Sequence, residues 1–377
     1  MIREKLRTLV KEYSERNKRN NCSAVYSVTN SHGFMSSTDY FSKEVFSKDL
    51  STYKIVRRGM IAYNPSRINV GSVAVQRAKE TVIVSPLYVV FSVDENKILP
   101  EFLTYFLHSD TGLQQIAAHT SGSVRDSLKF GALQDIEINL YSIEEQREII
   151  AKLQKVDDLL ECQRTVLKRL DDLVKSQFIE MFGGYSLRNK QSDWVKISSV
   201  AEIVGGSTPK TENAEYWGGK HNWITPAEIS DDSFIVYKTQ RTLTGAGVKS
   251  CSLRLLPIGT VLLSSRAPIG KVAITGVEMY CNQGFKNLIC GQSLNSIYIY
   301  YLLKFNSEYL NSLGRGATFK EISKSIVDNI AIPVPEIELQ NRFAAFVEQT
   351  DKSKFRIKQS LEKLEICYKA LLQKYFG

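Results

Sequence analysis

The sequence predicts an α+β protein made of two similar modules in tandem, each followed by a long α-helix of the coiled-coil type. Three observations lead to this prediction: an internal repeat, two matched heptad seams, and short apolar runs with glycine and proline turns upstream of each seam. A chain of 377 residues is also too long for one ordinary core, since domains of about 100 to 200 residues are typical.

The repeat is clearest where each module passes into its helix. Residues 133–140 match residues 327–334 in their apolar pattern, and Gln146 matches Gln340 at the same shift of 194 residues. Further upstream the shift drifts to 199 and 200, as loops of different length would produce. The duplication therefore covers the modules as well as the helices.

Both helical stretches carry apolar residues at alternating steps of four and three. The first seam runs from Ile149 to Met181, and its counterpart runs from Phe343 to Tyr375. This heptad spacing predicts coiled-coil packing, in a rod of roughly 50 Å for about 33 residues at ~1.5 Å per residue. The alternative is a pair of ordinary core helices inside two domains.

Local signals mark where these helices begin and end. Ser142-x-x-Glu145 is a capping box, and Gly183 is typical of a helix end. Polar residues interrupt the two seams at different levels: Gln163 stands opposite Ile357 in register, and Lys354 opposite Leu160. We expect such polar positions to help fix how the helices pair.

Upstream of each seam the pattern indicates short strands separated by turns. Residues 56–61 correspond to 256–261, and residues 71–75 to 270–274, each pair containing a turn glycine. A helix near residues 100–118 or 295–311, a glycine-containing basic loop and a last strand complete each module.

Composition excludes several classes of function. With 43% hydrophobic and 24% charged residues, and no apolar stretch near the ~20 residues that span a bilayer, we expect no membrane role. The N-terminus lacks the features of a signal peptide, so we expect a cytoplasmic protein. The six cysteines include no C-x-x-C pair and the four histidines are scattered, which predicts reduced, partly buried thiols and no zinc site.

The positive charge lies outside the helices. Residues 142–182 contain nine acids and seven bases, and residues 336–376 contain six acids and eight bases, so the two stretches cancel. The net charge of +9 therefore belongs to the modules. This location suits a phosphate backbone as the partner.

Loop residues with bidentate or phosphate-binding side chains are the candidates for contact with DNA. Asn or Gln can bind adenine through two hydrogen bonds and Arg can bind guanine in the same way, whereas Lys reaches phosphates. The alternative is that the Asn, Ser, Gly and Pro residues only form turns. The candidates are Tyr63, Asn64, Arg67 and Asn69 in the first module, and Ser207, Thr208, Lys210, Arg266, Lys271, Asn282, Gln283 and Lys286 in the second.

Two further loops, residues 121–125 and 314–320, occupy equivalent places before the last strand of each module. Their glycines allow close backbone approach, and Arg125, Arg315 and Lys320 are candidates for phosphate contact. A nucleotide-binding P-loop is not expected, because G-x-x-x-x-G-K-[ST] is absent.

Catalytic motifs of DNA-modifying enzymes are incomplete. Asn64-Pro65 resembles the start of the N-P-P-[YF] motif of amino-methyltransferases, but Ser66 and Arg67 follow, and no glycine-rich cofactor loop comes after a strand. Clustered carboxylates followed by a lysine, as in nucleases, are not found either. We therefore expect no catalytic residues and no metal ligands in this chain.

The whole arrangement resembles the specificity subunits of type I restriction-modification systems. The motifs that carry the resemblance are residues 333–340 and 140–146, each close to P-P-x-x-E-Q before a long helix, together with Ser207-Thr208-Pro209, residues 223–226 and Asn282-Gln283-Gly284. The first module departs from the family in lacking the opening Gly-Gly-Thr-Pro pattern, and both copies of P-P-x-x-E-Q are incomplete.

The resemblance implies a division into four parts and a set of partners. Residues 1–141 and 185–335 would be target-recognition domains, and residues 142–184 and 336–377 helices that pair as an antiparallel coiled coil. Each domain would read half of a bipartite and asymmetric site in double-stranded DNA, with at most about 15 base pairs between half-site centres.

No cofactor is expected on this chain itself. Two modification subunits would bind S-adenosylmethionine, and restriction subunits would use ATP and Mg²⁺ to cleave DNA. The alternative function is a non-catalytic coiled-coil adaptor for RNA or protein partners.

Overall fold

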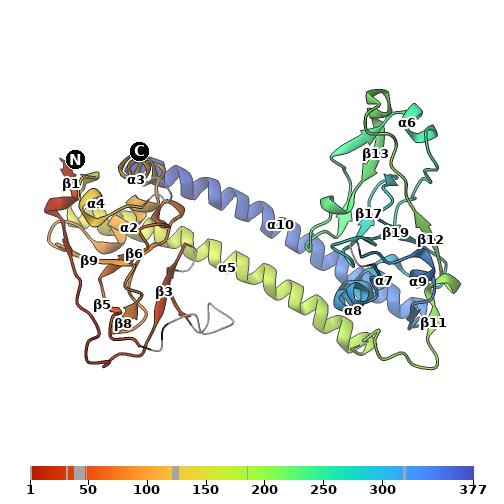
Figure 1. Ribbon diagram of the computed structural model, residues 1–377, viewed down its shortest axis with the longest axis horizontal. Coiled ribbons are helices and arrows are strands. Elements are labelled where there is room, and N and C mark those ends of the chain that lie inside the picture. Colours follow the sequence, from red (N-terminus) through yellow and green to blue (C-terminus); the bar gives the residue numbers. More distant parts are fainter. Residues whose placement is uncertain are drawn as a thin grey trace. The chain divides into compact units, whose positions relative to one another are not determined.

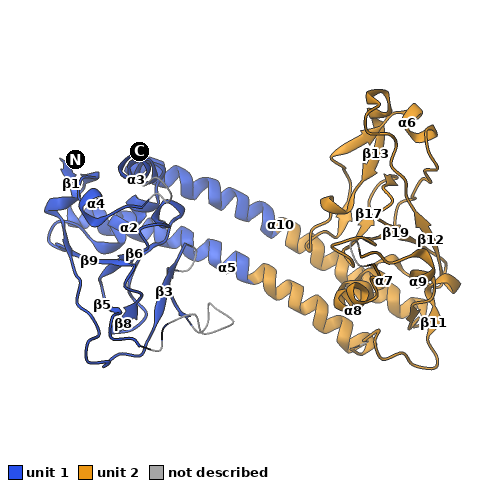
Figure 2. Cartoon of the chain, viewed as in Figure 1, with its two compact units in different colours: residues 1–165, 357–377 blue, residues 166–356 orange. Residues whose placement is uncertain are grey.

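The computed structural model describes residues 2–30, 33–37, 47, 49–120, 127–184, 186–316 and 320–377 (Figure 1). The chain divides into two compact units, one made of Met1–Thr165 with Ile357–Gly377 and the other of Val166–Arg356 (Figure 2). The division runs through two 40-residue helices, α5 (Ile143–Phe182) and α10 (Ile337–Phe376). Each unit therefore contains one module and part of each helix.

The first unit is built on a four-stranded antiparallel sheet of order β2-β9-β6-β7. The other strands of this unit form three separate two-stranded sheets, β1–β10, β3–β4 and β5–β8. The strands are β1 (Ile2–Lys5), β2 (Val10–Glu12), β3 (Tyr26–Thr29), β4 (Gly33–Ser36), β5 (Lys54–Arg57), β6 (Ile61–Tyr63), β7 (Val73–Val75), β8 (Thr81–Val84), β9 (Val89–Val93) and β10 (Glu137–Leu140). The module's helices are α2 (Pro100–His108), α3 (Asp110–His119) and α4 (Phe130–Leu133).

The second unit repeats this plan and extends it. Its main sheet has the order β12-β19-β16-β17-β14, a second sheet has the order β15-β13-β18, and β11 pairs with β20. The strands are β11 (Val195–Lys196), β12 (Ala201–Gly205), β13 (Trp217–Ile224), β14 (Ile235–Val236), β15 (Arg241–Leu243), β16 (Val261–Leu263), β17 (Val272–Thr275), β18 (Tyr280–Cys281), β19 (Lys286–Cys290) and β20 (Ala331–Ile332). The module's helices are α6 (Gly245–Lys249), α7 (Ser296–Phe305), α8 (Ser307–Ser312) and α9 (Lys324–Asp328).

Matching hydrogen bonds confirm the predicted repeat in the modules. The Gly59 amide donates to the Gln76 carbonyl at 3.0 Å, and the Gly259 amide donates to the Thr275 carbonyl at 2.8 Å. Both glycines have φ near +90°, at 90° and 84°, which side chains with a Cβ rarely adopt. The turns that lead into β6 and β16 are thus the same structure formed twice.

The predicted single helix of each module is two helices in the structure. Ser109 breaks the first at an extended backbone position (φ −72°, ψ 160°), and its hydroxyl accepts a hydrogen bond from the Gly112 amide at 3.1 Å. A Cβ on Gly112 would lie 2.0 Å from the Phe106 carbonyl oxygen, so only glycine fits this close approach. Asn306 divides α7 from α8 in the second module, where its side chain donates to the Leu302 carbonyl.

A buried glutamine connects each module to the helix that follows it. The Gln146 side chain accepts from the Leu99 amide at 2.9 Å and donates to the carbonyls of Lys97 and Tyr141 at 2.9 and 3.0 Å. Gln340 makes the same three bonds, to the Asn295 amide and to the carbonyls of Ser293 and Pro335. Both side chains are 0% exposed, so the glutamine pair at the centre of the sequence repeat has an identical structural role.

The helical seams pack as predicted. All the positions of both seams, from Ile149 to Met181 and from Phe343 to Tyr375, are buried or half-buried. Within each unit the two helix segments run antiparallel, and polar pairs join them. Gln163 Nε2 donates to Ser360 Oγ at 2.8 Å in the first unit, and Lys354 pairs with Asp171 in the second.

The hydrogen-bond partners of the polar seam residues are not the positions that the repeat alignment matched to them. Gln163 bonds Ser360 and Lys354 bonds Asp171, because antiparallel helices bring increasing numbers on α5 against decreasing numbers on α10. The start and end signals are confirmed. Ser142 and Glu145 exchange hydrogen bonds as a capping box, and the Gly183 amide donates to the Ile179 carbonyl.

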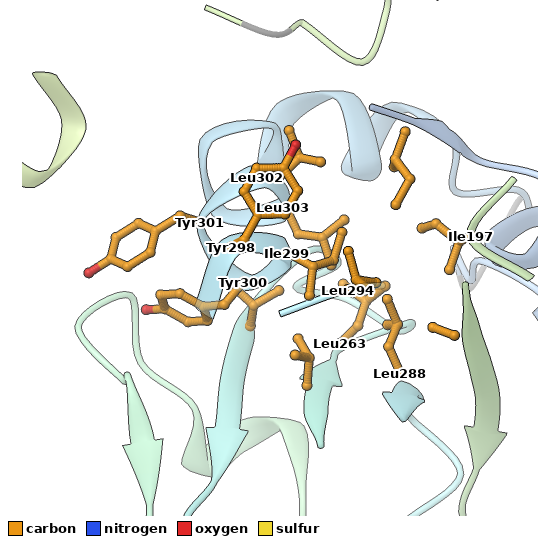
Figure 3. Close-up of a cluster of buried hydrophobic side chains, with 14 of the residues drawn as sticks. Ile197, Leu263, Leu288, Leu294, Tyr298, Ile299, Tyr300, Tyr301, Leu302 and Leu303 are labelled. Atoms are coloured by element: carbon orange, nitrogen blue, oxygen red, sulfur yellow. The ribbon is translucent and has the colours of Figure 1, made fainter. Parts of the chain in front are cut away.

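The far end of each helix completes a module core. In the second unit Phe178 and Phe182 of α5 pack against Tyr298 of α7 and Phe343 of α10, with ring centroids 4.8 to 5.8 Å apart. Figure 3 shows the α7 side of this core, in which Tyr298 and Leu302 lie beside Ile299 and Leu303. In the first unit Phe376 of α10 takes the matching place against α2.

The described residues hold no group of three or more His, Cys, Asp or Glu side chains placed to bind a metal ion. Within the same ranges, no helix has the length and apolar character needed to cross a membrane. All six cysteines are free thiols, of which Cys162 and Cys367 are exposed and the others are buried or half-buried.

Candidate nucleic-acid interface

Four segments of the second module meet beyond the ends of β12, β16 and β19. The Ser207 amide donates to the Cys281 carbonyl at 3.0 Å, and the Ser265 amide to the Gly284 carbonyl at 2.8 Å. The Ile322 amide then donates to the Ser265 carbonyl at 2.9 Å. These bonds bring residues 206–210, 264–268, 282–286 and 320–322 together, and Arg315 joins them through its backbone bonds with Glu321. These residues include most of the candidates of this module.

Glycine makes this junction possible. A Cβ on Gly206 would lie 2.1 Å from the Cys281 carbonyl oxygen and 2.4 Å from that of Asn282. No rearrangement of side chains could relieve such contacts, because the obstructing atoms belong to the backbone. Gly206 therefore lets the segment after β12 lie directly against the loop before β19.

Three charged side chains form an ion-pair cluster at the centre of the junction. Arg266 Nε lies 3.0 Å from Glu321 Oε2, and Lys286 Nζ lies 3.1 Å from Glu321 Oε1. Partial burial raises the pKa of Glu321, but the hydrogen bonds from Lys286 and Arg266 outweigh it and the net pKa is lowered. The Lys286 side chain is only 14% exposed, whereas that of Arg266 is 48% exposed.

Other candidates of this module have partners that fix the loops. Thr208 Oγ1 donates to Gln283 Oε1, and Asn282 Oδ1 accepts from the Gly284 amide at 2.9 Å, which is the turn-forming role given above as the alternative. Lys271 is half-buried, and its ammonium donates to the Ile229 carbonyl at 2.9 Å. Lys210, Gln283, Arg315 and Lys320 are exposed.

Two tryptophans support the segment that carries Ser207 and Lys210. Trp223 Nε1 donates to the Ser207 carbonyl at 3.1 Å, and Trp217 Nε1 donates to the Lys210 carbonyl at 3.3 Å. The Arg241 guanidinium stacks on Trp217, with its carbon 3.4 Å from the ring centroid. This segment is therefore held from β13 and β15, while the Lys210 side chain remains exposed.

In the first module the loop after β6 has the same framework with different residues. The Asn64 amide donates to the Ser72 carbonyl at 3.1 Å, as the Ser264 amide does to the Lys271 carbonyl at 2.9 Å. Asn64 Oδ1 accepts from the Ser66 amide and so also forms a turn. Arg67 and Asn69 are exposed, and Arg67 lines a small pocket of about 110 Å³ with Thr29, Asn30 and Tyr88 among its other walls.

Tyr63 differs from the other candidates of the first module. Tyr63 is fully buried, and its hydroxyl donates to the Leu128 carbonyl at 3.1 Å. The prediction that Tyr63 contacts DNA is therefore wrong, because the strand that precedes the loop turns this ring into the core. Arg125 lies outside the described residues.

A basic segment of the first module was not among the predicted contacts. Arg16, Lys18 and Arg19 are exposed, and the buried Asn17 between them holds the turn by bonding the Cys22 amide and carbonyl at 3.2 and 2.8 Å. In the sheets, Glu12 pairs with Phe91 as Ile203 pairs with Leu288. Glu12 and Ile203 are therefore equivalent positions, and four residues further along each chain segment, residues 16–19 correspond to residues 207–210.

The family model for the type I restriction modification DNA specificity domain matches residues 7–171 and 189–366. The chain belongs to this family. Each matched stretch contains a module and most of the helix that follows it. Membership makes the chain a specificity subunit, the non-catalytic component that recognises the DNA target in a type I restriction-modification system.

Curated specificity subunits are similar to this chain. The specificity subunit of the type I restriction enzyme MjaIX from Methanocaldococcus jannaschii is 39% identical over 202 residues, which cover 52% of this chain and 47% of that subunit. The alignment therefore spans about half of either chain. The HindI specificity subunit of Haemophilus influenzae is 20% identical over 399 residues, covering 85% of this chain and 87% of that subunit.

Solved structures share the fold. The S subunit of a type I system from M. genitalium is 16% identical, with a TM-score of 0.61 over 100% of this chain and 96% of that one. A chain from a structure on the assembly and conformational transition of a type I system is 21% identical, with a TM-score of 0.58 over 99% and 97%. The predicted fold class, two recognition domains in tandem with long helices, is confirmed.

Sequence reasoning missed two features of this specificity subunit. Glu321 was overlooked because an acidic residue is not an expected partner of phosphate, and its pairing with Arg266 bridges 55 residues of sequence. Arg16, Lys18 and Arg19 were overlooked because their loop shares no motif with residues 207–210. The cluster of basic and amide residues in Arg16-Asn17-Lys18-Arg19-Asn20-Asn21 was the available signal.

Proposed function

We propose that this specificity subunit reads the two halves of a bipartite, asymmetric site in double-stranded DNA, one half with each module. The observation that supports it most is the pair of equivalent loops after β6 and β16. They have the same backbone framework, yet one carries Asn64, Arg67 and Asn69 and the other carries Arg266 and Lys271. Equal frameworks with unequal side chains suit two half-sites of different sequence.

The two long helices serve as the spacer between the half-sites in this proposal. Support comes from seams that are buried or half-buried along their whole length and from the polar pairs Gln163–Ser360 and Lys354–Asp171. Because helices that pair in a fixed register cannot slide, the gap between half-sites would be constant. Changing Leu167 and Leu361 to Lys should make the spacing between the half-sites variable.

The chemistry of the complex resides on partner subunits in this proposal. Two modification subunits would bring S-adenosylmethionine and methylate the DNA, and restriction subunits would bring ATP and Mg²⁺, all in the cytoplasm. The specificity subunit would direct both to the site. The purified chain alone should accordingly bind no S-adenosylmethionine.

A DNA-binding titration with the modification subunits present tests this function. Binding should weaken steeply with salt, with the logarithm of the association constant falling by about 0.9 per neutralised phosphate for each tenfold rise in salt. A selection from random duplexes should return one split motif. Absent binding, or binding that ignores salt, would contradict the proposal and favour an adaptor for protein partners. Preference for RNA would favour the RNA-binding alternative.

A further inference from the structure

The Arg266 side chain is held on one side only. Its Nε donates to Glu321 Oε2 at 3.0 Å, and no bond to its two terminal nitrogens is found among the described residues. The side chain is 48% exposed. The N–H groups of the two terminal nitrogens, which can bind a planar acceptor, therefore remain available, while the Nε–H is used inside the protein.

Glu321 is itself fixed to the framework. Its amide donates to the Arg315 carbonyl at 3.0 Å and its carbonyl accepts from the Arg315 amide at 3.1 Å. The next residue, Ile322, is fully buried and its amide bonds the Ser265 carbonyl, beside Arg266. The backbone that carries the Glu321 carboxylate is thus fixed beside Arg266.

Lys286 is a second partner of the Glu321 carboxylate. Its ammonium lies 3.1 Å from Glu321 Oε1 and 3.3 Å from Ser265 Oγ, and only 14% of the side chain is exposed. A lysine so enclosed is poorly placed to reach a phosphate. It compensates the second oxygen of Glu321 and keeps the carboxylate ionised, in agreement with the lowered pKa of Glu321.

We propose that Glu321 is a positioning residue that orients Arg266 to read a guanine in the half-site bound by the second module. A guanidinium held at Nε presents its terminal nitrogens as a fork, which matches the O6 and N7 acceptors of guanine in the major groove. Fixing the fork beforehand reduces the rotamer entropy lost on binding. This inference rests on the proposed function, because it requires the second module to face DNA.

The test compares variants of the full chain assembled with its modification subunits. The probe is a pool of DNA duplexes with randomised positions, from which the wild-type complex selects its motif. Glu321→Gln should lower the preference for guanine at one position of one half-site by about tenfold, within the 1–3 kcal/mol that a bidentate arginine–guanine pair contributes. The other half-site and the remaining positions should be unchanged.

Two further variants separate positioning from a structural role. Arg266→Lys keeps the charge but loses the fork, and should lose the same guanine preference. Glu278→Gln removes an exposed carboxylate that bonds neither Arg266 nor Lys286 among the described contacts, and should leave the motif unaltered. If Glu321→Gln fails to fold, Arg266→Lys still tests the guanine reading.

The inference is overturned if Glu321→Gln keeps the wild-type guanine preference, or if it weakens all sequences equally. It is also overturned if Arg266→Lys selects the same motif as the wild type. These results differ from failure of the proposed function, in which the wild-type complex itself would select no motif.

Discussion

Replacing Gln146 by Ala should destabilise the first unit and leave the second intact. The side chain is fully buried and satisfies three backbone groups: the Leu99 amide and the carbonyls of Lys97 and Tyr141. Alanine leaves all three without their partner and creates a cavity at the junction of α5 with its module.

The size of the effect follows from these three contacts. Removing one partner of a buried hydrogen bond costs about 1–3 kcal/mol, and some of the freed carbonyls will bind water, so we expect about 3–5 kcal/mol in the free energy of unfolding. Gln154 is exposed on the same helix, and Gln154→Ala should change the stability by less than about 0.5 kcal/mol.

Denaturant titration combined with hydrogen–deuterium exchange measures both the magnitude and the place. In Gln146→Ala, exchange should rise in residues 97–108 and stay unchanged in residues 293–305, where Gln340 makes the matching bonds. Gln340→Ala should give the reverse pattern. A Gln146→Ala protein as stable as the Gln154→Ala control would refute the reasoning.

Three other changes have defined outcomes. Arg67→Ala should weaken binding by about 1–3 kcal/mol and relax one position in the half-site of the first module, measured by selection from random duplexes; equal weakening on every sequence would assign Arg67 to phosphate instead. Phe178→Ala should lower the free energy of unfolding by about 3–5 kcal/mol, since this residue is 2% exposed. Ile179→Ala, at a residue that is 46% exposed, should cost far less, and comparable losses in the two variants would contradict the assignment of Phe178 to the core. Trp223→Phe keeps an apolar ring but removes the donor to the Ser207 carbonyl. Binding to the half-site of the second module should weaken about fivefold, as loss of a hydrogen bond of about 1 kcal/mol predicts, and an unchanged DNA titration would show that this bond is dispensable.

The helices and the repeat were predictable because their signals are periodic and local. A heptad seam places one face of a helix against a partner whatever the rest of the fold, and the capping box at Ser142 depends on four residues. Gln146 and Gln340 stood out as a matched pair in the sequence, although the three bonds that each makes could not be derived from it.

The contact residues were less predictable because exposure depends on tertiary structure. Tyr63 and Arg67 lie four residues apart, yet one is in the core and the other on the surface, since β6 ends between them. Asn64 and Asn282 form turns, a role that the sequence could not separate from base contact. Glu321 lies beside Arg266 because its backbone bridges both Arg266 and Arg315, an arrangement that no local pattern indicates.

Mapping of methylated bases across the genome of cells that carry this chain with its modification subunits tests the central claim most directly. The account predicts one methylated motif with two different half-sites and a constant gap, and a change in only one half when residues 185–335 are exchanged for those of a relative. An uninterrupted motif, or a change in both halves after that exchange, would contradict it.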